Sequence, residues 1–510
     1  MKVTLIVPPS TISKYSNMSP AVPPIGLAYV ARSLLDAGHD VQLIDAVGEA
    51  PDRFVPIDDG LLYRGLGIDE VIKKIKPSGA IGVGVMFSQE WMVARKLLNV
   101  IHTVFPDTVI FVGGEHPTAL PEAVLEGTPG VKYVLTGEGD RNSCELMEHL
   151  EGKRSIDEVS GVYYRDGQNI KKGTGGKIRI KEVNTIGWPA WHLVPLENYM
   201  SGGHSYGVNR GRSIPMMASR GCPYQCTFCS NPAMWTTRWV ARDPEDVLKE
   251  IKHYIKIFQV ENFDFHDLTV IVKKSWIIQF CKLLIQENLQ ITWQLPTGTR
   301  SEAIDEEVAY HLWKAGCRNL GYAPESGTEE ILKKIKKIIN KDRMIKSVQG
   351  CVKVGLNVKA NFIVGFPGDR PRMYWETAVF LCRLAFVGLN DISVTAFSAY
   401  PGSALFIQFQ KEGRLPKNLD DDYYRSLHHT DITKAISWTE HISSEDLSRI
   451  RNRLLLTFYI VSWTFRPQRF LKIIYHFIIG KEESRIDKVL AQMKNRLKKV
   501  KEYEGLSDSK

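Results

Sequence analysis

The sequence lacks any apolar run long enough to cross a membrane, and it has no internal repeat and no low-complexity tract. Its longest apolar stretch, residues 454–465, falls short of the roughly 20 residues that a membrane-spanning helix needs. The opening MKVTLIVPPS has too short an apolar segment for a signal peptide and no small-residue cleavage site, so we interpret it as a first β-strand. We therefore expect a soluble, cytoplasmic protein.

The sequence also lacks a large excess of charge of one sign. It has 66 Lys and Arg and 57 Asp and Glu, which gives a net charge of +9. A dedicated nucleic-acid binder usually carries a larger excess. The lysine-rich segment 333–343 has no aromatic platforms among its cations and is expected to be a solvated helix face. We therefore predict no nucleic-acid partner.

The composition, 44% hydrophobic and 24% charged, is that of a globular chain, and 510 residues suggest about three domains.

Cysteine is scarce, with eight residues in the whole chain. Five of them stand alone, a distribution that excludes a secreted disulfide framework and favours a reducing compartment. The other three, Cys222, Cys226 and Cys229, fall within SRGCPYQCTFCS (219–230). This group is the first candidate for chemistry in the sequence.

Residues 1–150 alternate short β-rich runs with helical runs, which predicts a doubly wound parallel sheet of the flavodoxin or Rossmann type. In such a sheet, ligands bind beyond the carboxyl ends of the strands. The expected strands are 2–8, 40–45, 80–86, 108–114 and 132–136, and the expected helices are 24–38, 68–76, 88–105 and 120–127. The candidate ligand contacts at the strand ends are Pro8, Pro9, Met86, Phe87, Ser88, Gly113, Gly114, Glu115, His116, Gly137, Glu138 and Gly139.

A second alternation of strands and helices begins near residue 208 and indicates an open or partial (β/α)6 barrel over residues 208–430. Residues 151–207 are a predicted connector, and residues 431–510 a predicted helical C-terminal segment. The strands expected in the barrel are 213–219, 262–267, 291–297, 319–325, 357–365 and 391–400.

The three clustered cysteines have the spacing C-x3-C-x2-C and directly follow the first strand of the predicted barrel. Three thiolates on a short loop can converge on one soft-ligand centre. Structural zinc, the alternative, prefers four ligands from two separated pairs, and no second C-x2-C or paired His follows at a suitable distance. The spacing favours a 4Fe-4S cluster whose fourth iron stays open to an exogenous ligand.

CPYQCTFC (222–229) resembles the signature of the radical S-adenosylmethionine (SAM) enzymes. The resemblance is to the subgroup with an N-terminal cobalamin-binding domain, which includes class B-like methyltransferases and relatives of the anaerobic magnesium-protoporphyrin ester cyclases. It covers residues 1 to about 430, and Asp140 and Asp369 stand where this subgroup more often has Glu. The other segments that carry it are PPIGLAYVARSL (23–34), VGGEHPTALPE (112–122), LTGEGD (135–140), GYAPESGTEEIL (321–332), NFIVGFPGD (361–369) and SAYPGSALF (398–406).

The resemblance implies catalytic roles for residues of the barrel, which would then be a radical SAM barrel. The three thiolates would hold three irons of the cluster, and SAM would chelate the fourth iron. Phe228 would contact the adenine, with loop-anchoring core as the alternative. Glu325 with Ser326 would bond ribose hydroxyls or the methionine ammonium, with a strand-end salt bridge as the alternative. Asp267 and Arg300 would touch the methionine moiety or the substrate, or else have surface or structural roles.

For the N-terminal domain, the resemblance implies a cobalamin site built from the strand-end residues Met86 to Ser88, Gly113 to His116 and Gly137 to Gly139. Many cobalamin proteins supply a lower axial histidine from a D-x-H-x-x-G sequence, which is absent here. We therefore expect cobalt without a histidine ligand from that motif. Residues 86–88 would lie under the cobalt face, and His116 would touch the corrin side chains or the nucleotide tail.

Together the two cofactors imply a cobalamin-dependent radical SAM methyltransferase. A 5′-deoxyadenosyl radical would remove hydrogen from an unactivated carbon, which would then receive a methyl group from methylcobalamin. One alternative is a radical oxidative cyclase or rearrangement enzyme of the anaerobic porphyrin cyclase type, without net methylation. Another is a non-catalytic cobalamin- or redox-sensing protein. The expected substrate is a small molecule or lipid-like, and an external flavodoxin or ferredoxin system must donate electrons, because no second cluster motif exists.

Residues 453–479 are apolar with interleaved Arg, Lys and aromatic residues. They are predicted to be a pair of helices that cap the barrel mouth and pack on the core. The alternatives are the lining of a hydrophobic substrate cavity and a peripheral membrane contact, since cations that flank an apolar face favour anionic headgroups.

Overall fold

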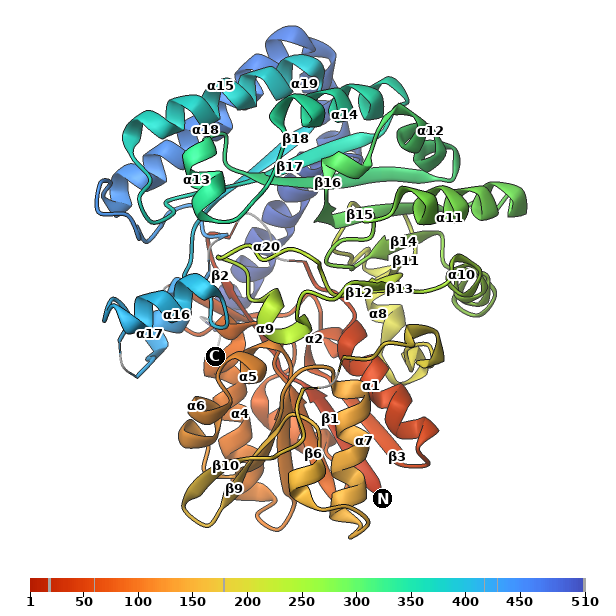
Figure 1. Cartoon of the computed structure of the whole chain (residues 1–510), viewed down its shortest axis with the longest axis vertical. Helices are drawn as coiled ribbons and strands as arrows, with labels where there is room; N and C mark the ends of the chain where they lie inside the picture. The colour runs from red at the N-terminus through yellow and green to blue at the C-terminus, as the bar shows by residue number, and fades with distance from the viewer. Residues whose placement is uncertain (17–19, 59, 178, 417, 429, 508–510) are drawn as a thin grey trace.

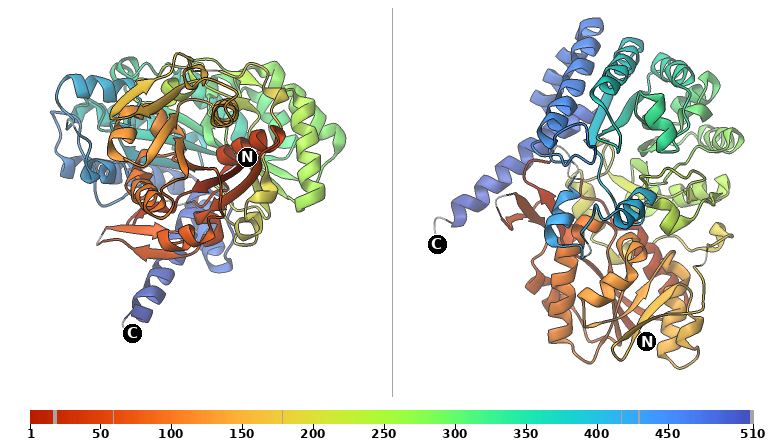
Figure 2. Two further views of the ribbon diagram at one scale, coloured as in Figure 1. Left: turned by 90° about the horizontal axis from the view of Figure 1, so that it is seen from below. Right: turned by 60° about the vertical axis from the view of Figure 1, so that its left-hand side comes forward.

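The computed structural model describes residues 1–16, 20–58, 60–177, 179–416, 418–428 and 430–507. Two α/β units are stacked along its long axis, with the N-terminal unit below the barrel unit in Figure 1. The C-terminal helices run along one side of the barrel unit (Figure 2, right). This arrangement confirms the expected α/β class with a helical C-terminal region.

The N-terminal unit contains the predicted parallel sheet, whose strands are apolar because helices cover both faces. In sheet order the strands are β10 (Asn169–Lys172), β9 (Val162–Asp166), β8 (Val131–Leu135), β7 (Val109–Gly113), β6 (Ala80–Gly84), β1 (Lys2–Val7) and β3 (Asp40–Asp45). The helices are α1 (Ile25–Asp36), α2 (Ala46–Glu49), α3 (Ile68–Lys74), α4 (Trp91–Val104), α5 (Glu115–Ala119), α6 (Pro121–Gly127) and α7 (Gly139–Leu150).

Two antiparallel features of this unit have no counterpart in the predicted elements. The hairpin β9–β10 lies within the predicted connector and pairs with β8, so the sheet extends beyond residue 150. A small separate sheet is formed by β2 (Ser10–Ser13), β5 (Leu61–Arg64) and β4 (Phe54–Pro56). The connector then continues into α8 (Leu196–Ser201), where the Tyr199 hydroxyl donates a 2.8 Å hydrogen bond to Asp45 at the end of β3.

The second unit is the predicted partial (β/α)6 barrel, with parallel strands in chain order and open edges at its first and last strands. Its strands are β11 (Ser213–Met216), β14 (Asn262–Phe265), β15 (Thr292–Thr299), β16 (Cys317–Glu325), β17 (Asn357–Val364) and β18 (Asp391–Ala396). The outer helices are α10 (Pro244–Phe258), α11 (Lys274–Glu287), α12 (Glu306–Lys314), α14 (Lys341–Lys353) and α15 (Pro371–Val387). Shorter elements are β12 (Ser219–Arg220), β13 (Val240–Ala241), α9 (Asn231–Trp235), α13 (Glu329–Lys334), α16 (Ala404–Lys411) and α17 (Asp421–Ser426).

The C-terminal segment forms α18 (Ser444–Phe465), α19 (Pro467–Ile479) and α20 (Arg485–Ser507). α18 packs on α15 and β18, and α20 passes the amino end of the barrel and returns to the N-terminal unit at β4. None of the helices in the described ranges combines the length and the apolarity that crossing a bilayer requires.

Candidate active site

The carboxyl ends of the two sheets face each other, and side chains from both units bond across the joint. The Ser88 amide donates a 3.0 Å hydrogen bond to the hydroxyl of Tyr400, which lies just beyond β18. That hydroxyl donates in turn to the Gln89 side chain. The Ser230 hydroxyl donates to the Glu115 carboxylate at the start of α5. The strand ends of the N-terminal sheet and the loops beyond the barrel strands therefore form one region.

The cysteine loop, residues 219–230, lies in this region at the end of β11. Its thiols are free, and Cys222, Cys226 and Cys229 are each partly exposed. The Thr227 amide donates to the Ile335 carbonyl (3.0 Å), and the Thr227 carbonyl accepts from the Leu405 amide (2.9 Å). Gly221 has φ +83°, and a Cβ there would overlap the Arg238 carbonyl oxygen, so the turn into the loop requires glycine. The loop is thus anchored on both sides, and its three cysteines are neither fully buried nor fully exposed.

The thiols provide the donor set of an iron–sulfur cluster. Burial raises the pKa of Cys229 to about 12 and also raises the pKa of Cys226, whose thiolate the nearby Lys337 ammonium favours. Binding of soft metal to thiolates supplies the stabilisation that ionisation needs in such surroundings. Among the described residues, no three His, Cys, Asp or Glu side chains converge closely enough to hold a single ion. Three free thiols on an anchored loop fit a cluster that bonds one thiolate at each of three corners.

Asp267 supports the cysteine loop from below. It follows β14, is fully buried, and accepts hydrogen bonds from the Ser219 hydroxyl (2.6 Å) and the Ala218 amide (3.1 Å). Burial raises its pKa to about 6, and these donors oppose that shift. Its carboxylate is therefore directed at the strand that leads into the loop.

Glu325 and Arg300 both reach the cysteine loop. Glu325 ends β16 with φ +67°, a left-handed conformation that is strained for a residue with a Cβ, and its carboxylate lies 3.0 Å from the Lys337 ammonium. Both members of this ion pair are buried. The positive charge of Lys337 also favours the thiolate form of Cys226. The Arg300 guanidinium lies 4.0 Å above the ring of Tyr224, a residue of the loop. The site thus has a fixed carboxylate and two cations beside the thiols.

The position of Lys337 corrects the expectation that 333–343 is a solvated helix face. α13 ends at Lys334, and Lys336 takes a left-handed conformation with φ +53°. This turn directs the next side chain inward, where Lys337 is buried against Glu325. The inward position of Lys337 follows from the left-handed backbone at Lys336, and the residue type at position 336 does not predict that conformation.

Two other predicted SAM contacts have structural partners. The Phe228 ring packs edge-on against Phe366, with 5.5 Å between ring centroids. The buried Ser326 hydroxyl accepts a 3.2 Å hydrogen bond from the Thr328 amide, which shapes the turn into α13. Phe366 belongs to the fifth-strand turn, which Asp369 stabilises by accepting from the Phe366 amide (3.0 Å) and the Gly365 amide (2.8 Å).

The predicted cobalamin contacts at β6 and β7 differ in exposure. Met86 and Phe87 are each 47% exposed beyond the end of β6, where they can meet a ligand. His116 is buried, with its Nδ1 atom 3.0 Å from the Ser88 hydroxyl, and its Nε2 atom has no hydrogen-bond partner in the part of the chain that the structure describes. Burial lowers the pKa of His116 to about 3, so its imidazole is neutral. Gly114 has φ +118°, and a Cβ would overlap the Val85 carbonyl, so this turn also requires glycine. Exposed apolar side chains beside an unpartnered imidazole nitrogen fit a large amphipathic cofactor such as cobalamin.

The segment Gly137 to Gly139 lies at the joint between the units. The Glu138 carboxylate pairs with Arg179 and, at 3.0 Å, with Arg220 of the cysteine loop. Asp140 also pairs with Arg220, at 2.7 Å. These four charged side chains, which we call the arginine clamp, are mostly buried. The clamp arginines are absent from the predicted site, and the only signal for Arg220 is its place two residues before the first cysteine.

Two family models match the chain. The model of the Radical SAM superfamily matches residues 216–381, and that of the B12 binding domain matches residues 17–146. The first range covers most of the barrel unit, and the second covers most of the N-terminal unit.

Curated relatives match over most of the chain at low identity. An uncharacterized methyltransferase of Pyrococcus horikoshii is 27% identical over 93% of this chain and 95% of its own length. Cytidylyl-2-hydroxyethylphosphonate methyltransferase of Streptomyces wedmorensis is 26% identical, covering 81% of this chain and 82% of its own. The anaerobic magnesium-protoporphyrin IX monomethyl ester cyclase of a Synechocystis strain is 28% identical, over 66% and 63%.

Solved structures share the fold. The radical SAM methyltransferase TsrM of Kitasatospora setae, solved with cobalamin and a 4Fe-4S cluster, aligns with a TM-score of 0.64 and 16% identity over 81% of this chain and 78% of its own. The cobalamin-dependent SAM radical enzyme OxsB, solved with aqua-cobalamin and SAM, aligns with a TM-score of 0.66 and 18% identity over 81% and 61%.

Proposed function

We propose a function from the premise that this chain belongs to the radical SAM superfamily and carries a B12 binding domain ahead of its radical SAM domain. The enzyme is a cobalamin-dependent radical methyltransferase that places a methyl group on an unactivated carbon. The observation that carries this proposal is the joint itself. The cysteine loop of one unit and the strand ends of the B12 binding domain open into the same region, bonded through Tyr400 and Ser88.

The chain's own residues bind and orient in this scheme. When bound, the cluster with SAM supplies a carbon radical, and cobalamin supplies the methyl group. Cys222, Cys226 and Cys229 hold the cluster. Glu325, fixed by Lys337, offers a buried carboxylate to the ammonium or hydroxyl groups of SAM. Met86 and Phe87 offer an apolar face to cobalamin.

Other partners follow from the same chemistry. We assign electron delivery to an external flavodoxin or ferredoxin system, because the sequence has no second cluster motif. All eight cysteines are free thiols, which supports a reducing compartment, and we place the enzyme in the cytoplasm. The substrate is a small molecule or lipid-like.

A large apolar patch supports a substrate that is met at a membrane surface. Exposed rings and aliphatic side chains continue from α15 across α18 to α19, with Phe386 and Phe465 4.9 Å apart between centroids. Exposed cations such as Arg372 and Arg453 accompany it, which favours an anionic lipid surface as its occupant. The patch consists of Trp375, Val379, Phe386, Leu456, Ile460, Phe465, Phe470, Leu471, Ile474, Tyr475, Phe477, Ile478 and Ile479.

A radical cyclase is the second candidate, and the 28% identity with a magnesium-protoporphyrin ester cyclase favours it. The two candidates differ in product mass, because only a methyltransferase adds one CH₂ to its substrate. They share the cluster and its SAM chemistry.

The decisive experiment is anaerobic reconstitution with iron, sulfide and hydroxocobalamin, followed by assays of iron, cobalamin and deoxyadenosine. We expect iron–sulfur absorbance, bound cobalamin, and reductant-dependent release of deoxyadenosine from SAM. Cys226→Ala should lose the absorbance and the deoxyadenosine, while Cys382→Ala, a matched thiol on α15, should retain both. Mass spectrometry of candidate products then separates methylation from cyclisation. A single bound zinc, with no iron–sulfur absorbance, would refute the proposal.

A further inference from the structure

The lumen of the barrel is unusually polar along β17. Its residues alternate between buried apolar side chains toward the outer helices, such as Val358 and Ala360, and partly exposed ones toward the lumen, including Lys359 and Asn361. Filled (β/α) barrels normally carry branched apolar side chains at such positions. A lysine in this place needs a reason.

The side-chain ammonium of Lys359 has no hydrogen-bond or ion-pair partner within the described ranges. Its ammonium lies 5.8 Å from the ring centroid of Tyr206, which also faces the lumen. The nearest acid in the cavity, Asp391, is already bonded to the Arg485 amide (2.8 Å) and to the Tyr459 hydroxyl (3.3 Å). The Lys359 ammonium therefore points into the cavity without a hydrogen-bonded acid among the described residues, and Asp391 favours its charge only through space.

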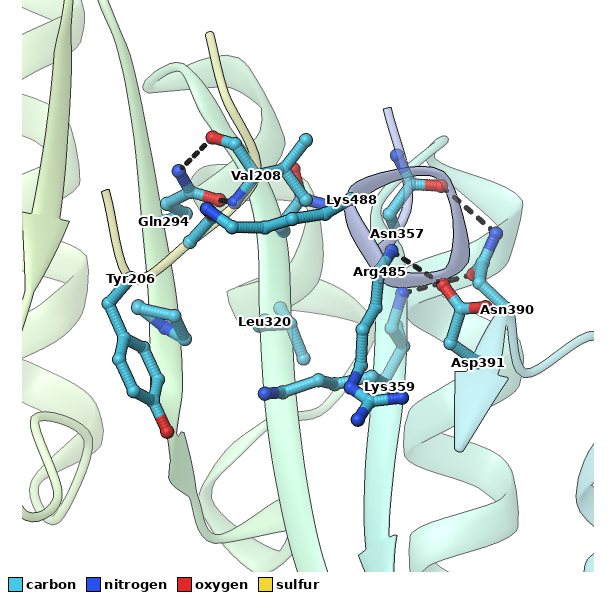
Figure 3. Close-up of a pocket in the computed structure, with 14 residues that line it drawn as sticks. Tyr206, Val208, Gln294, Leu320, Asn357, Lys359, Asn390, Asp391, Arg485 and Lys488 are labelled. Atoms are coloured by element: carbon cyan, nitrogen blue, oxygen red, sulfur yellow. Dashed lines mark hydrogen bonds between the residues drawn. The ribbon is translucent and has the colours of Figure 1, made fainter. Parts of the chain in front are cut away.

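A second cation lies beside the first. Arg485 begins α20, which closes the amino end of the barrel, and its guanidinium enters the same cavity (Figure 3). Its terminal nitrogens donate to the Ile392 carbonyl (3.1 Å) and the Ser393 hydroxyl (3.2 Å), while Nε has no hydrogen-bond partner among the residues that the structure describes. Burial, together with the charge of Arg485, lowers the pKa of Lys359 to about 7. Two cations that line one cavity can supply the donors of an anion site.

The remaining lumen groups are suited to the same ligand. His266 directly follows β14 and lies 5.7 Å from Tyr206 between ring centroids. Its buried Nε2 atom has no hydrogen-bond partner within the described part of the chain. In Figure 3 the Tyr206 hydroxyl and the Arg485 guanidinium are directed deeper into the barrel, and the Lys359 side chain extends across the lumen toward Tyr206. The cavity measures about 40 Å³, and one water needs roughly 10–15 Å³, so a small oxyanion group fits.

Lys488 provides an internal comparison in the same cavity. Its ammonium donates to the Ser205 carbonyl (2.7 Å), the Ser205 hydroxyl (3.2 Å) and the Gly207 carbonyl. These bonds complete its three donors and hold α20 against the barrel. Of the two lysines that line the cavity, only Lys359 is available to a ligand.

We propose that Lys359 and Arg485 bind an anionic group of the substrate, a carboxylate or a phosphate-type oxyanion, inside the barrel. Calling this ligand the substrate depends on the proposed function. The anionic end lies at the amino end of the lumen, and the carbon to be modified lies toward the cysteine loop at the carboxyl ends. The site therefore selects elongated substrates with an acidic terminus.

The test is anion binding to the full, reconstituted chain, with inorganic phosphate and acetate as separate probes in calorimetry. We expect Lys359→Met and Arg485→Met to weaken binding at least tenfold. Lys353→Met, which alters an exposed lysine on α14, should leave it unchanged. Tighter binding of phosphate indicates a phosphate-type group, and tighter binding of acetate a carboxylate. Equal binding in all four proteins, or no binding of either anion to the wild type, would overturn the proposal.

A second measurement uses the wild type alone and so tests the site even if the variants fail to fold. In the wild type, competitive acetylation by acetic anhydride, read from peptide masses, should show Lys359 half-reactive near pH 7 and protected several-fold by the bound anion. Lys488 should not respond to the anion. Equal responses of both lysines would contradict the site. Deoxyadenosine release by the wild type without substrate is a separate readout. Its absence would count against the methyltransferase and leave the anion site standing.

Discussion

Arg220 illustrates how much one side chain can carry at this site. It pairs with both Asp140 and Glu138 while buried, so replacing it leaves two carboxylates in a water-poor joint. We expect Arg220→Met to cost about 3–5 kcal/mol of stability, the usual cost of breaking a buried ion pair. Urea unfolding of the variant and the wild type measures this. Arg32→Met, which breaks only the exposed pair with Asp36, should cost less than about 1 kcal/mol. Equal urea midpoints for the two variants would contradict the clamp.

The raised pKa of Asp369 predicts that the stability of the fold depends on pH. Its pKa is raised by burial to about 6 in the folded chain, above its ordinary value near 4. A carboxyl with a raised folded pKa stabilises the fold fully below pH 4 and loses that contribution as pH rises through 6.

In Asp369→Asn, the fall in apparent melting temperature between pH 4 and pH 6.5 should therefore be shallower than in the wild type. The amide oxygen can still accept from the Gly365 and Phe366 amides, so the turn persists. Thermal scans across this range check the prediction, with Asp36→Asn on the exposed face of α1 as the control. An unchanged slope would mean that Asp369 does not titrate in this window.

At the scale of elements, the sequence predicts what apolar periodicity encodes. The parallel strands are short apolar runs between helices, and all the expected ones are confirmed with ends shifted by a few residues. The hairpin β9–β10 escapes prediction because an edge strand such as NIKK is mostly polar. The small sheet of β2, β5 and β4 escapes because each of its strands is only three or four residues long.

The apolar patch gives a prediction for α19. Leu471 and Ile478 are 65% and 75% exposed and lie two turns apart on one face. We expect the wild type to cosediment with phosphatidylglycerol vesicles, and Leu471→Asp with Ile478→Asp to reduce that binding at least tenfold, because the new charges oppose insertion. The matched control is Ile257→Asp, a 55% exposed residue on α10.

Binding to neutral phosphatidylcholine vesicles should be weaker, and added salt should weaken binding to the anionic ones, since the exposed arginines contribute. If the double variant instead changes a monomer–dimer equilibrium and leaves sedimentation with vesicles intact, the patch serves a second copy of the chain.

For the whole molecule, the site depends on a joint between segments far apart in sequence. The cysteines and the strand ends could be predicted, because a short motif and the carboxyl-end rule identify them locally. Their partners could not, since Arg220 meets Asp140 and Tyr400 meets Ser88 only once both units have folded. Lys337 needs the same tertiary information, because its inward position follows from the left-handed turn at Lys336.

The joint itself is testable through Tyr400. Its hydroxyl accepts from the Ser88 amide and donates to Gln89, so Tyr400→Phe leaves a part-buried donor of the other unit unpaired. An unpaired buried donor costs about 1–3 kcal/mol of local stability, which raises the population of the locally open state at least severalfold. We expect amide hydrogen exchange to rise in residues 86–90 and in residues 398–403 together. Tyr133→Phe, whose hydroxyl bonds His149 inside the N-terminal unit, should leave both segments unchanged. A rise confined to the barrel side would show that the two units do not depend on each other here, and that Met86 and Phe87 keep their position without the barrel.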